Sequence, residues 1–264
     1  MKLGFIGCGN MAGAMLGGIL KKNLMGKEEI IASTSREESL KRVKETYGIC
    51  TTLDNREVAE KAEILILAVK PQYYEQVIGE VKDCVTDEQV IVSIAPGKSL
   101  AWLEEKFEKP CKLVRCMPNT PALVGEGITG VCRNGRVAEE ELEQVCEILK
   151  SCGEVEILTE NLMDVVVSVS GSSPAYVFMF IEAMADAAVA DGMPRAQAYK
   201  FASQAILGSA KMVLETGKHP GELKDMVCSP AGTTIEAVRV LEEKGFRSAV
   251  IEAMKACVKK GRSM

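Results

Sequence analysis

Histidine is nearly absent from this sequence, since His219 is the only one among 264 residues. Any reaction that depends on a histidine, such as Ser-His-Asp or Cys-His catalysis, would have to use that residue. It lies in Gly217-Lys218-His219-Pro220-Gly221, a pattern typical of a turn between two helices. We therefore expect His219 not to be catalytic, which argues against histidine-dependent hydrolysis.

Closely spaced metal ligands are also missing. The ten cysteines are scattered along the chain, and no C-x-x-C pair occurs. A structural zinc site needs four nearby ligands, usually with such short spacings, so we expect no metal. In a small secreted chain these cysteines would indicate disulfides, but in a chain of this length their scatter indicates reduced, small core residues.

Long apolar runs, charged blocks and charged tails are absent too. No run approaches the roughly 20 apolar residues of a membrane helix. Glycines interrupt the apolar start of the chain, unlike a signal peptide. The formal net charge is -5 without a basic block, which argues against a nucleic-acid surface. We expect a cytoplasmic protein that binds neither membranes nor nucleic acid.

The most informative stretch that is present runs from Lys2 to Gly18. A short apolar run precedes Gly7-Cys8-Gly9-Asn10-Met11-Ala12, which fits G-x-G-x-x-A, and apolar residues then recur at helical spacing. In a strand-turn-helix unit, Gly7 permits the tight turn, Gly9 lets a pyrophosphate approach the backbone, and Ala12 lets the helix pack on the strand. The stretch predicts dinucleotide binding; a purely structural glycine turn is the alternative.

Apolar runs typical of buried parallel strands recur up to about residue 158. Each strong run stops at a glycine or proline loop, and in open α/β sheets ligands gather at the carboxyl ends of the strands. Lys70 and Pro71 are therefore candidates by position alone. The pattern predicts an α/β fold, with a doubly wound dinucleotide-binding domain of the Rossmann type over residues 1–159. The expected strands are 30–32, 49–51, 62–71, 89–94, 112–117, 127–132 and 154–158.

The end of the second expected strand selects the cofactor. An NAD site usually places an acid there, whereas a 2′-phosphate is bound by small hydroxyls and an arginine. Thr34, Ser35 and Arg36 therefore favour NADP, with NADPH preferred to NADH. Glu28 and Glu29 precede the strand and so lie at its wrong end. The alternative is that Arg36 merely begins the following helix.

From residue 160 onward, strand signals vanish and helix signals replace them. The sequence predicts an all-helical domain over 160–264, with Ser170–Pro174 interrupting its first helical segment. Residues 175–181 are consecutively apolar, so their helix has little polar face and lies either at the centre of the domain or between subunits. We expect homo-oligomerisation through these helices; packing within a single chain is the alternative.

A second candidate anion site lies at Ser229 to Thr234, because small residues and free amides at a helix start suit a carboxylate or phosphate. The expected substrate is a small acid that accepts hydride. Reduction of a ketone normally needs a strong donor such as histidine or lysine. No lysine occurs from Glu160 to Tyr199. An imine is protonated before hydride arrives and needs only a weak polar partner, so imine reduction is favoured.

Six motifs follow one another along the chain. They are 5–12 (FIGCGNMA), 68–71 (AVKP), 117–121 (MPNTP), 170–176 (SGSSPAY), 191–193 (DGM) and 229–235 (SPAGTTI). Together they resemble the pyrroline-5-carboxylate reductase family over essentially the whole chain, with Ser173 and Ala231 where that family usually has glycine. The resemblance implies NAD(P)H-dependent reduction of 1-pyrroline-5-carboxylate to L-proline, the last step of proline biosynthesis.

The resemblance also implies roles for single residues. The hydroxyl of Thr234 is the catalytic partner of the ring nitrogen, nearby amides hold the substrate carboxylate, and Glu160 borders the site. For Glu160, an acid in the first turn of a helix is an equally good interpretation. The chain would form a domain-swapped helical dimer that assembles further, commonly to a decamer. The implied substrate residues are Glu160, Ser229, Gly232, Thr233 and Thr234, and the implied cofactor residues are Ile6, Gly7, Cys8, Gly9, Asn10, Met11, Thr34, Arg36, Asn55, Ala68, Val69, Lys70, Pro71, Ala95, Pro96, Gly97, Met117 and Asn119.

Two other functions stay open. A related imine or β-hydroxyacid reductase would share both domains, but the β-hydroxyacid enzymes need a lysine on the helix after the interdomain glycine segment, and that helix has none. A non-catalytic NADP-binding sensor would keep the fold without the chemistry. The pair Thr233 and Thr234 in the second anion site disfavours it.

Overall fold

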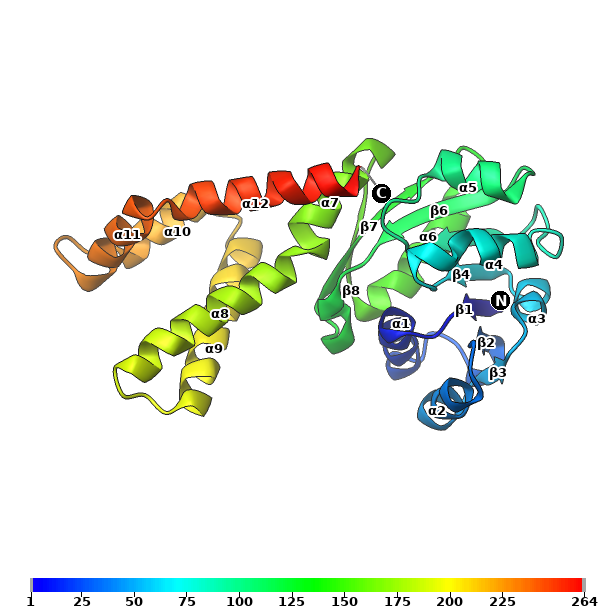
Figure 1. Ribbon diagram of the computed structural model, residues 1–264, viewed down its shortest axis with the longest axis horizontal. Coiled ribbons are helices and arrows are strands. Elements are labelled where there is room, and N and C mark those ends of the chain that lie inside the picture. Colours follow the sequence, from blue (N-terminus) through cyan, green and yellow to red (C-terminus); the bar gives the residue numbers. More distant parts are fainter. Residues whose placement is uncertain (1, 263–264) are drawn as a thin grey trace. The chain divides into compact units, whose positions relative to one another are not determined.

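The computed structural model describes residues 2–262. The chain divides into two compact units (Figure 1). The first contains the residues up to Ser172 together with those from Cys257 onward, and the second contains Ser173–Ala256. Each unit is described by itself below.

The first unit is built on a sheet of eight strands within the described residues. The spatial order is β3-β2-β1-β4-β5-β6-β7-β8, and every neighbouring pair is parallel except β6 and β7. The first six strands have the order of a doubly wound dinucleotide-binding fold, which confirms the predicted fold class. The strands are β1 (Leu3–Ile6), β2 (Ile30–Ser33), β3 (Cys50–Thr52), β4 (Ile64–Leu67), β5 (Val90–Ser93), β6 (Lys112–Met117), β7 (Gly127–Arg133) and β8 (Gly153–Ile157).

Helices cover both faces of this sheet. One buried core joins the sheet to α1, α2 and α6, and the other joins the opposite face to α3, α4, α5 and α7. The central strands are buried along their whole length because each face packs on a helical layer, which is why they appear in the sequence as continuous apolar runs. The helices are α1 (Asn10–Lys21), α2 (Glu37–Tyr47), α3 (Asn55–Lys61), α4 (Tyr74–Val81), α5 (Leu100–Phe107), α6 (Glu139–Leu149) and α7 (Met163–Val166).

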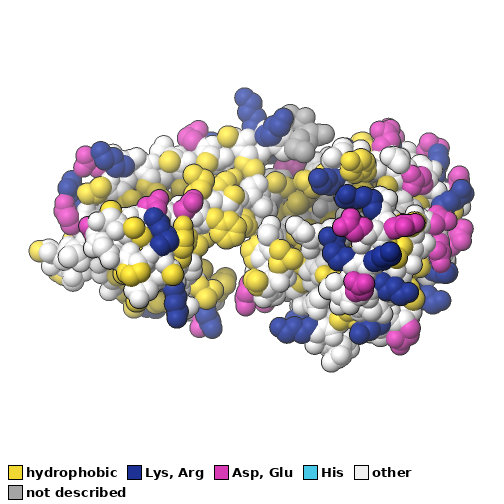
Figure 2. All heavy atoms as spheres, turned by 60° about the horizontal axis from the view of Figure 1, so that its bottom comes forward, with side chains coloured by type: hydrophobic (Ala, Val, Ile, Leu, Met, Phe, Trp, Pro, Cys, Tyr) yellow, Lys and Arg dark blue, Asp and Glu magenta, His cyan; other side chains and the backbone are white. Residues whose placement is uncertain are grey.

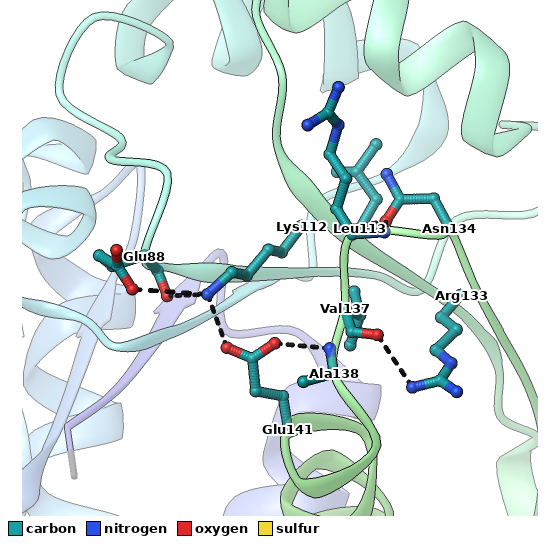
Figure 3. Close-up of polar contacts among 9 residues, drawn as sticks. Glu88, Lys112, Leu113, Arg133, Asn134, Val137, Ala138 and Glu141 are labelled. Carbon is teal, nitrogen blue, oxygen red and sulfur yellow. Dashed lines mark hydrogen bonds and ion pairs between the residues drawn. The ribbon is translucent and has the colours of Figure 1, made fainter.

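A polar cluster joins the amino end of β6 to the start of α6 (Figure 3). Lys112 Nζ lies 2.8 Å from Glu141 Oε1 and 3.5 Å from Glu88 Oε2, and the other oxygen of Glu141 accepts a hydrogen bond of 2.8 Å from the amide of Ala138. Burial raises the pKa of Glu141, but the hydrogen bonds from Lys112 and Ala138 outweigh it and lower the pKa below its ordinary value. The cluster therefore stabilises the sheet at the end opposite to the loops that follow β4, β5 and β6.

The second unit is helical. Its helices are α8 (Ser173–Ala190), α9 (Arg195–Thr216), α10 (Pro220–Val227), α11 (Thr233–Glu243) and most of α12 (Phe246–Gly261). Helices α8 and α9 pack together, and the rings of Phe180 and Phe246 lie 6.0 Å apart. Apolar side chains nevertheless reach the surface of this unit (Figure 2). Phe178, Phe201 and Leu214 are among the exposed ones.

The expected interruption at Ser170–Pro174 takes a different form. A π-helical turn, Val167–Gly171, replaces the break, and Ser172 N donates to Val167 O at 2.7 Å, so that the chain is helical almost continuously to the end of α8. The resulting 31-residue stretch, Glu160–Ala190, is long and apolar enough to cross a membrane, contrary to the expectation that the chain contains no such stretch. One such helix is weak evidence for a membrane span, because core helices of soluble proteins share its length and composition.

Candidate active site

The glycine turn has the geometry that a pyrophosphate site requires. Gly7 has φ 88°, and a Cβ on it would lie 2.7 Å from a methyl group of Val69, so both conformation and space demand glycine. Gly9 faces open space and precedes α1, whose start is capped by no side chain. Burial raises the pKa of the Cys8 thiol to about 11, although the nearby Arg42 acts to lower it. The thiol therefore stays protonated and adds no negative charge to the loop. The residues present therefore fit a dinucleotide phosphate.

The loops after β1, β4, β5 and β6 lie along one edge of the sheet, because these strands are parallel. The chain order reverses between β1 and β4, and such switch points are where doubly wound folds bind nucleotides. The two strands stay joined past their ends, since Ala68 N donates to Ile6 O at 2.8 Å. The structure thus gathers the predicted cofactor loops: Gly7–Met11, Ala68–Pro71, Ala95–Gly97 and Met117–Asn119.

The residues predicted to select the cofactor follow β2 at the same edge. Thr34 Oγ1 donates to Arg36 O at 3.1 Å, and Arg36 is the exposed residue that precedes α2. Asn55, the first residue of α3, accepts from Ser33 Oγ at 2.7 Å and donates to Glu80 at 2.7 Å. The acids at 28 and 29 lie in a turn before β2, so they occupy its amino end as expected.

Asn119 is fully engaged by the protein itself. Its Oδ1 accepts from the amide of Ile128 at 2.9 Å, and its Nδ2 donates to the carbonyl of Ser170 in the π-helical turn at 3.1 Å. The side chain is 7% exposed. It therefore joins the end of β6 to β7 and to the turn before α8, and its place near a nicotinamide stays a prediction.

Glu160 pairs with Arg115, a buried arginine for which the sequence motifs predicted no role. Its Oε1 lies 3.1 Å from Arg115 on β6 and also accepts from the amide of Leu100, at the start of α5, at 2.7 Å. Asp164 lies 3.6 Å from the same guanidinium, whose Nε is buried without a hydrogen bond. The sequence signal for this pair is the position of Arg115 inside the apolar run 112–117, because an arginine buried in a strand needs a carboxylate partner. The contact of Glu160 with substrate stays a prediction.

The candidate substrate loop lies in the second unit. Ala231 has φ 57°, a left-handed conformation that suits glycine, and Gly232 is the residue before α11. No side chain caps that helix, so its first amides, at Thr233 and Thr234, are available to an anion. The structure thus puts Ser229 and Gly232 in the loop before α11 and Thr233 and Thr234 at the start of that helix, all in the second unit, whereas the predicted cofactor residues lie in the first.

A doubly wound sheet with an open glycine turn at its switch point defines a dinucleotide-binding protein, and this chain is of that class. Residues 2–97 match the family model described as "NADP oxidoreductase coenzyme F420-dependent", and residues 160–264 match "Pyrroline-5-carboxylate reductase dimerisation". The chain belongs to the pyrroline-5-carboxylate reductase family.

Relatives and a solved structure carry this assignment. The chain is 52% identical over 263 residues to the pyrroline-5-carboxylate reductase of Escherichia coli (strain K12), covering 100% of this chain and 98% of that one. It is 44% identical over 253 residues to the enzyme of Methanosarcina acetivorans, covering 96% and 94%. The crystal structure of Plasmodium falciparum pyrroline carboxylate reductase with NADP bound superposes with a TM-score of 0.91 at 33% identity, covering 100% and 97%.

Proposed function

We propose that this protein reduces 1-pyrroline-5-carboxylate to L-proline. The observation that carries the proposal is the 52% identity, across the whole chain, to a pyrroline-5-carboxylate reductase. When bound, NADPH supplies a hydride to the imine carbon, and the protonated ring nitrogen becomes the amine of proline. The chain's own residues bind and orient the two reactants.

The test is a purified-protein assay that follows the absorbance of NADPH after the imine is added. We expect turnover with wild type and a fall of about 100-fold in kcat for Thr234→Ala, because the substituted side chain no longer reaches the ring nitrogen. Thr233→Ala is the matched control, since it keeps the backbone amide and should retain most turnover. No turnover of wild type with either NADPH or NADH would contradict the function, and an unaltered Thr234→Ala would remove that hydroxyl from the mechanism.

We assign coenzyme binding to residues 1–159 and substrate binding to the second half, 160–264. In the first half the uncapped start of α1 would hold the pyrophosphate, and the loops after β4, β5 and β6 would line the rest of the dinucleotide. In the second half the amides at the start of α11 would hold the substrate carboxylate. Both assignments rely on unpaired amides at a helix start, which favour anions.

NADPH is the proposed coenzyme, with Arg36 as the residue that distinguishes it from NADH. Its exposed guanidinium follows Thr34 and Ser35 at the carboxyl end of β2, and these two residues carry hydroxyls where an NAD site usually places an acid. Arg36→Ala should raise the KM for NADPH about tenfold, because one charge-assisted pairing is lost, and leave the KM for NADH unchanged. Equal losses for both coenzymes would show that Arg36 only begins α2.

The proposed assembly is a domain-swapped homodimer that associates further, to a decamer, in the cytoplasm. Support for association comes from the family match of residues 160–264 and from the apolar surface of the second unit. Support for a reducing compartment comes from the cysteines, all ten of which are free.

A further inference from the structure

Two adjacent tyrosines at the carboxyl edge of the sheet have opposite environments. Tyr73 ends a short helical turn, Pro71–Tyr73, and is 51% exposed. Tyr74 begins α4 and is fully buried in the core between the sheet and that helical layer. The hydroxyl of a buried tyrosine usually has hydrogen-bond partners, and those of Tyr74 lie at the ends of two neighbouring strands.

The Tyr74 hydroxyl joins the last residues of two neighbouring strands. It donates to the carbonyl oxygen of Leu67 at 2.5 Å, and it accepts from Ser93 Oγ at 3.3 Å and from the amide of Ile94 at 3.2 Å. Leu67 and Ser93 are paired in register as the final residues of β4 and β5. The hydroxyl therefore continues the hydrogen bonding of the sheet one step beyond its last residue pair.

The two loops that start at this point are those placed against the coenzyme. Ala68–Pro71 follows Leu67 directly, and Ala95–Gly97 follows Ile94 directly. Where a parallel pair ends, the final carbonyl and amide groups otherwise take water, which leaves the spacing of the following loops loosely defined. Burial raises the pKa of Tyr74 far above its ordinary value, so the hydroxyl keeps its proton and remains a donor to Leu67.

We propose that Tyr74 is a positioning residue for coenzyme binding, because its hydroxyl holds the loops after β4 and β5 at a fixed separation. It touches no reactant itself, since its side chain is inaccessible. The inference rests on the proposed function insofar as it takes these loops as coenzyme contacts. Tyr74 acts through the backbone of Leu67 and Ile94, to which its hydroxyl is hydrogen-bonded.

A purely structural role makes a different prediction. Removing the hydroxyl leaves a buried carbonyl and a buried serine without their partner, which lowers stability in either case. If Tyr74 only filled the core, the phenyl ring of Tyr74→Phe would preserve the loops and the affinity for coenzyme. The distinguishing measurement is therefore the coenzyme dissociation constant, recorded beside the melting temperature.

The experiment titrates NADPH and then NADH into the full-length wild type, Tyr74→Phe and the control Tyr73→Phe by calorimetry. We expect Tyr74→Phe to weaken the binding of NADPH and of NADH about tenfold each. The displaced loops would contact the portion of the dinucleotide that is common to both coenzymes. Tyr73→Phe should bind as wild type does. A Tyr74→Phe protein that melts at a lower temperature but binds within twofold of wild type would overturn the proposal.

Two further outcomes also bear on the role of Tyr74. If Tyr74→Phe does not fold, Ser93→Ala removes one donor to the same hydroxyl and should weaken both coenzymes about two- to threefold; unchanged binding by that variant would overturn the proposal. If wild type itself binds neither coenzyme, the proposed function fails, and the role of Tyr74 fails with it. If wild type binds both coenzymes and only Tyr74→Phe and Ser93→Ala bind them more weakly, both the proposed function and the positioning role of Tyr74 are supported.

Discussion

The two units of this chain bury their apolar residues to very different extents. In the first unit, strands such as β1, β4 and β5 are buried along their whole length by helices of the same unit. In the second, only Ala185, Ala198 and Ala202 are fully buried apolar residues among those described, while Phe178 is 60% and Leu214 is 84% exposed. Apolar side chains exposed in such numbers are typical of a surface that binds another protein. The first unit thus completes its own core, whereas the second presents a surface for another copy of the chain.

The candidate polar groups of the two units show this contrast only in part. In the first unit the side chains of Asn55, Asn119 and Glu160 are held by hydrogen bonds within the unit. In the second unit the start of α11 has no side-chain cap. The start of α1 in the first unit is uncapped as well, so each unit leaves the first amides of one helix open for an anion.

The largest effect is expected from a charge on the apolar surface of the second unit. Phe178→Glu should weaken self-association at least about 100-fold, because a carboxylate would have to be buried without a partner in the interface. Sedimentation velocity would record the loss. The control is Leu24→Glu, since Leu24 is 43% exposed in the first unit and the change there should leave assembly intact. Wild-type sedimentation by Phe178→Glu would mean that this surface is not the interface.

A smaller effect is expected from the buried ion pair of the first unit. Glu160→Gln should lower the free energy of unfolding by about 2 kcal/mol, because Arg115 stays buried beside a neutral amide. Asp164→Asn should cost about half as much, since Asp164 lies at 3.6 Å and Glu160 at 3.1 Å. Urea unfolding followed through Trp102, the only tryptophan, would report on this unit. Equal losses of stability for the two variants would contradict the prediction that Glu160 stabilises Arg115 more than Asp164 does.

The smallest effect is expected at the strained residue of the second unit. Ala231→Gly should raise the free energy of unfolding by about 0.5–1 kcal/mol, because glycine adopts φ 57° without the steric cost that alanine bears. The same exchange in the middle of α9, Ala210→Gly, should instead lower stability by about 1 kcal/mol. Thermal unfolding followed by far-ultraviolet circular dichroism would show the opposite signs. A loss in both variants would indicate that the loop gains nothing from glycine.

Much of the fold was predictable because its signals are local. The glycine turn, the buried strands and the helix ends at Gly192 and Gly217 each depend on a few adjacent residues, and the last two adopt the left-handed conformation that glycine permits. The π-helical turn was not predictable in this way. Ser170–Pro174 has the composition of a break, and the hydrogen bond from Asn119, which lies 51 residues away from Ser170, is part of what holds the chain there.

The sequence by itself determined the class of fold, the place of the phosphate turn and the helical nature of the second half, since these follow from periodicity and from backbone demands within a few residues. The tertiary structure alone decided the reversal of β7, the pairing of Arg115 with Glu160 across 45 residues, and the bridge that Tyr74 makes between β4 and β5. Such contacts join residues that are distant in the chain. Their partners become identifiable only when the sheet brings the strand ends together.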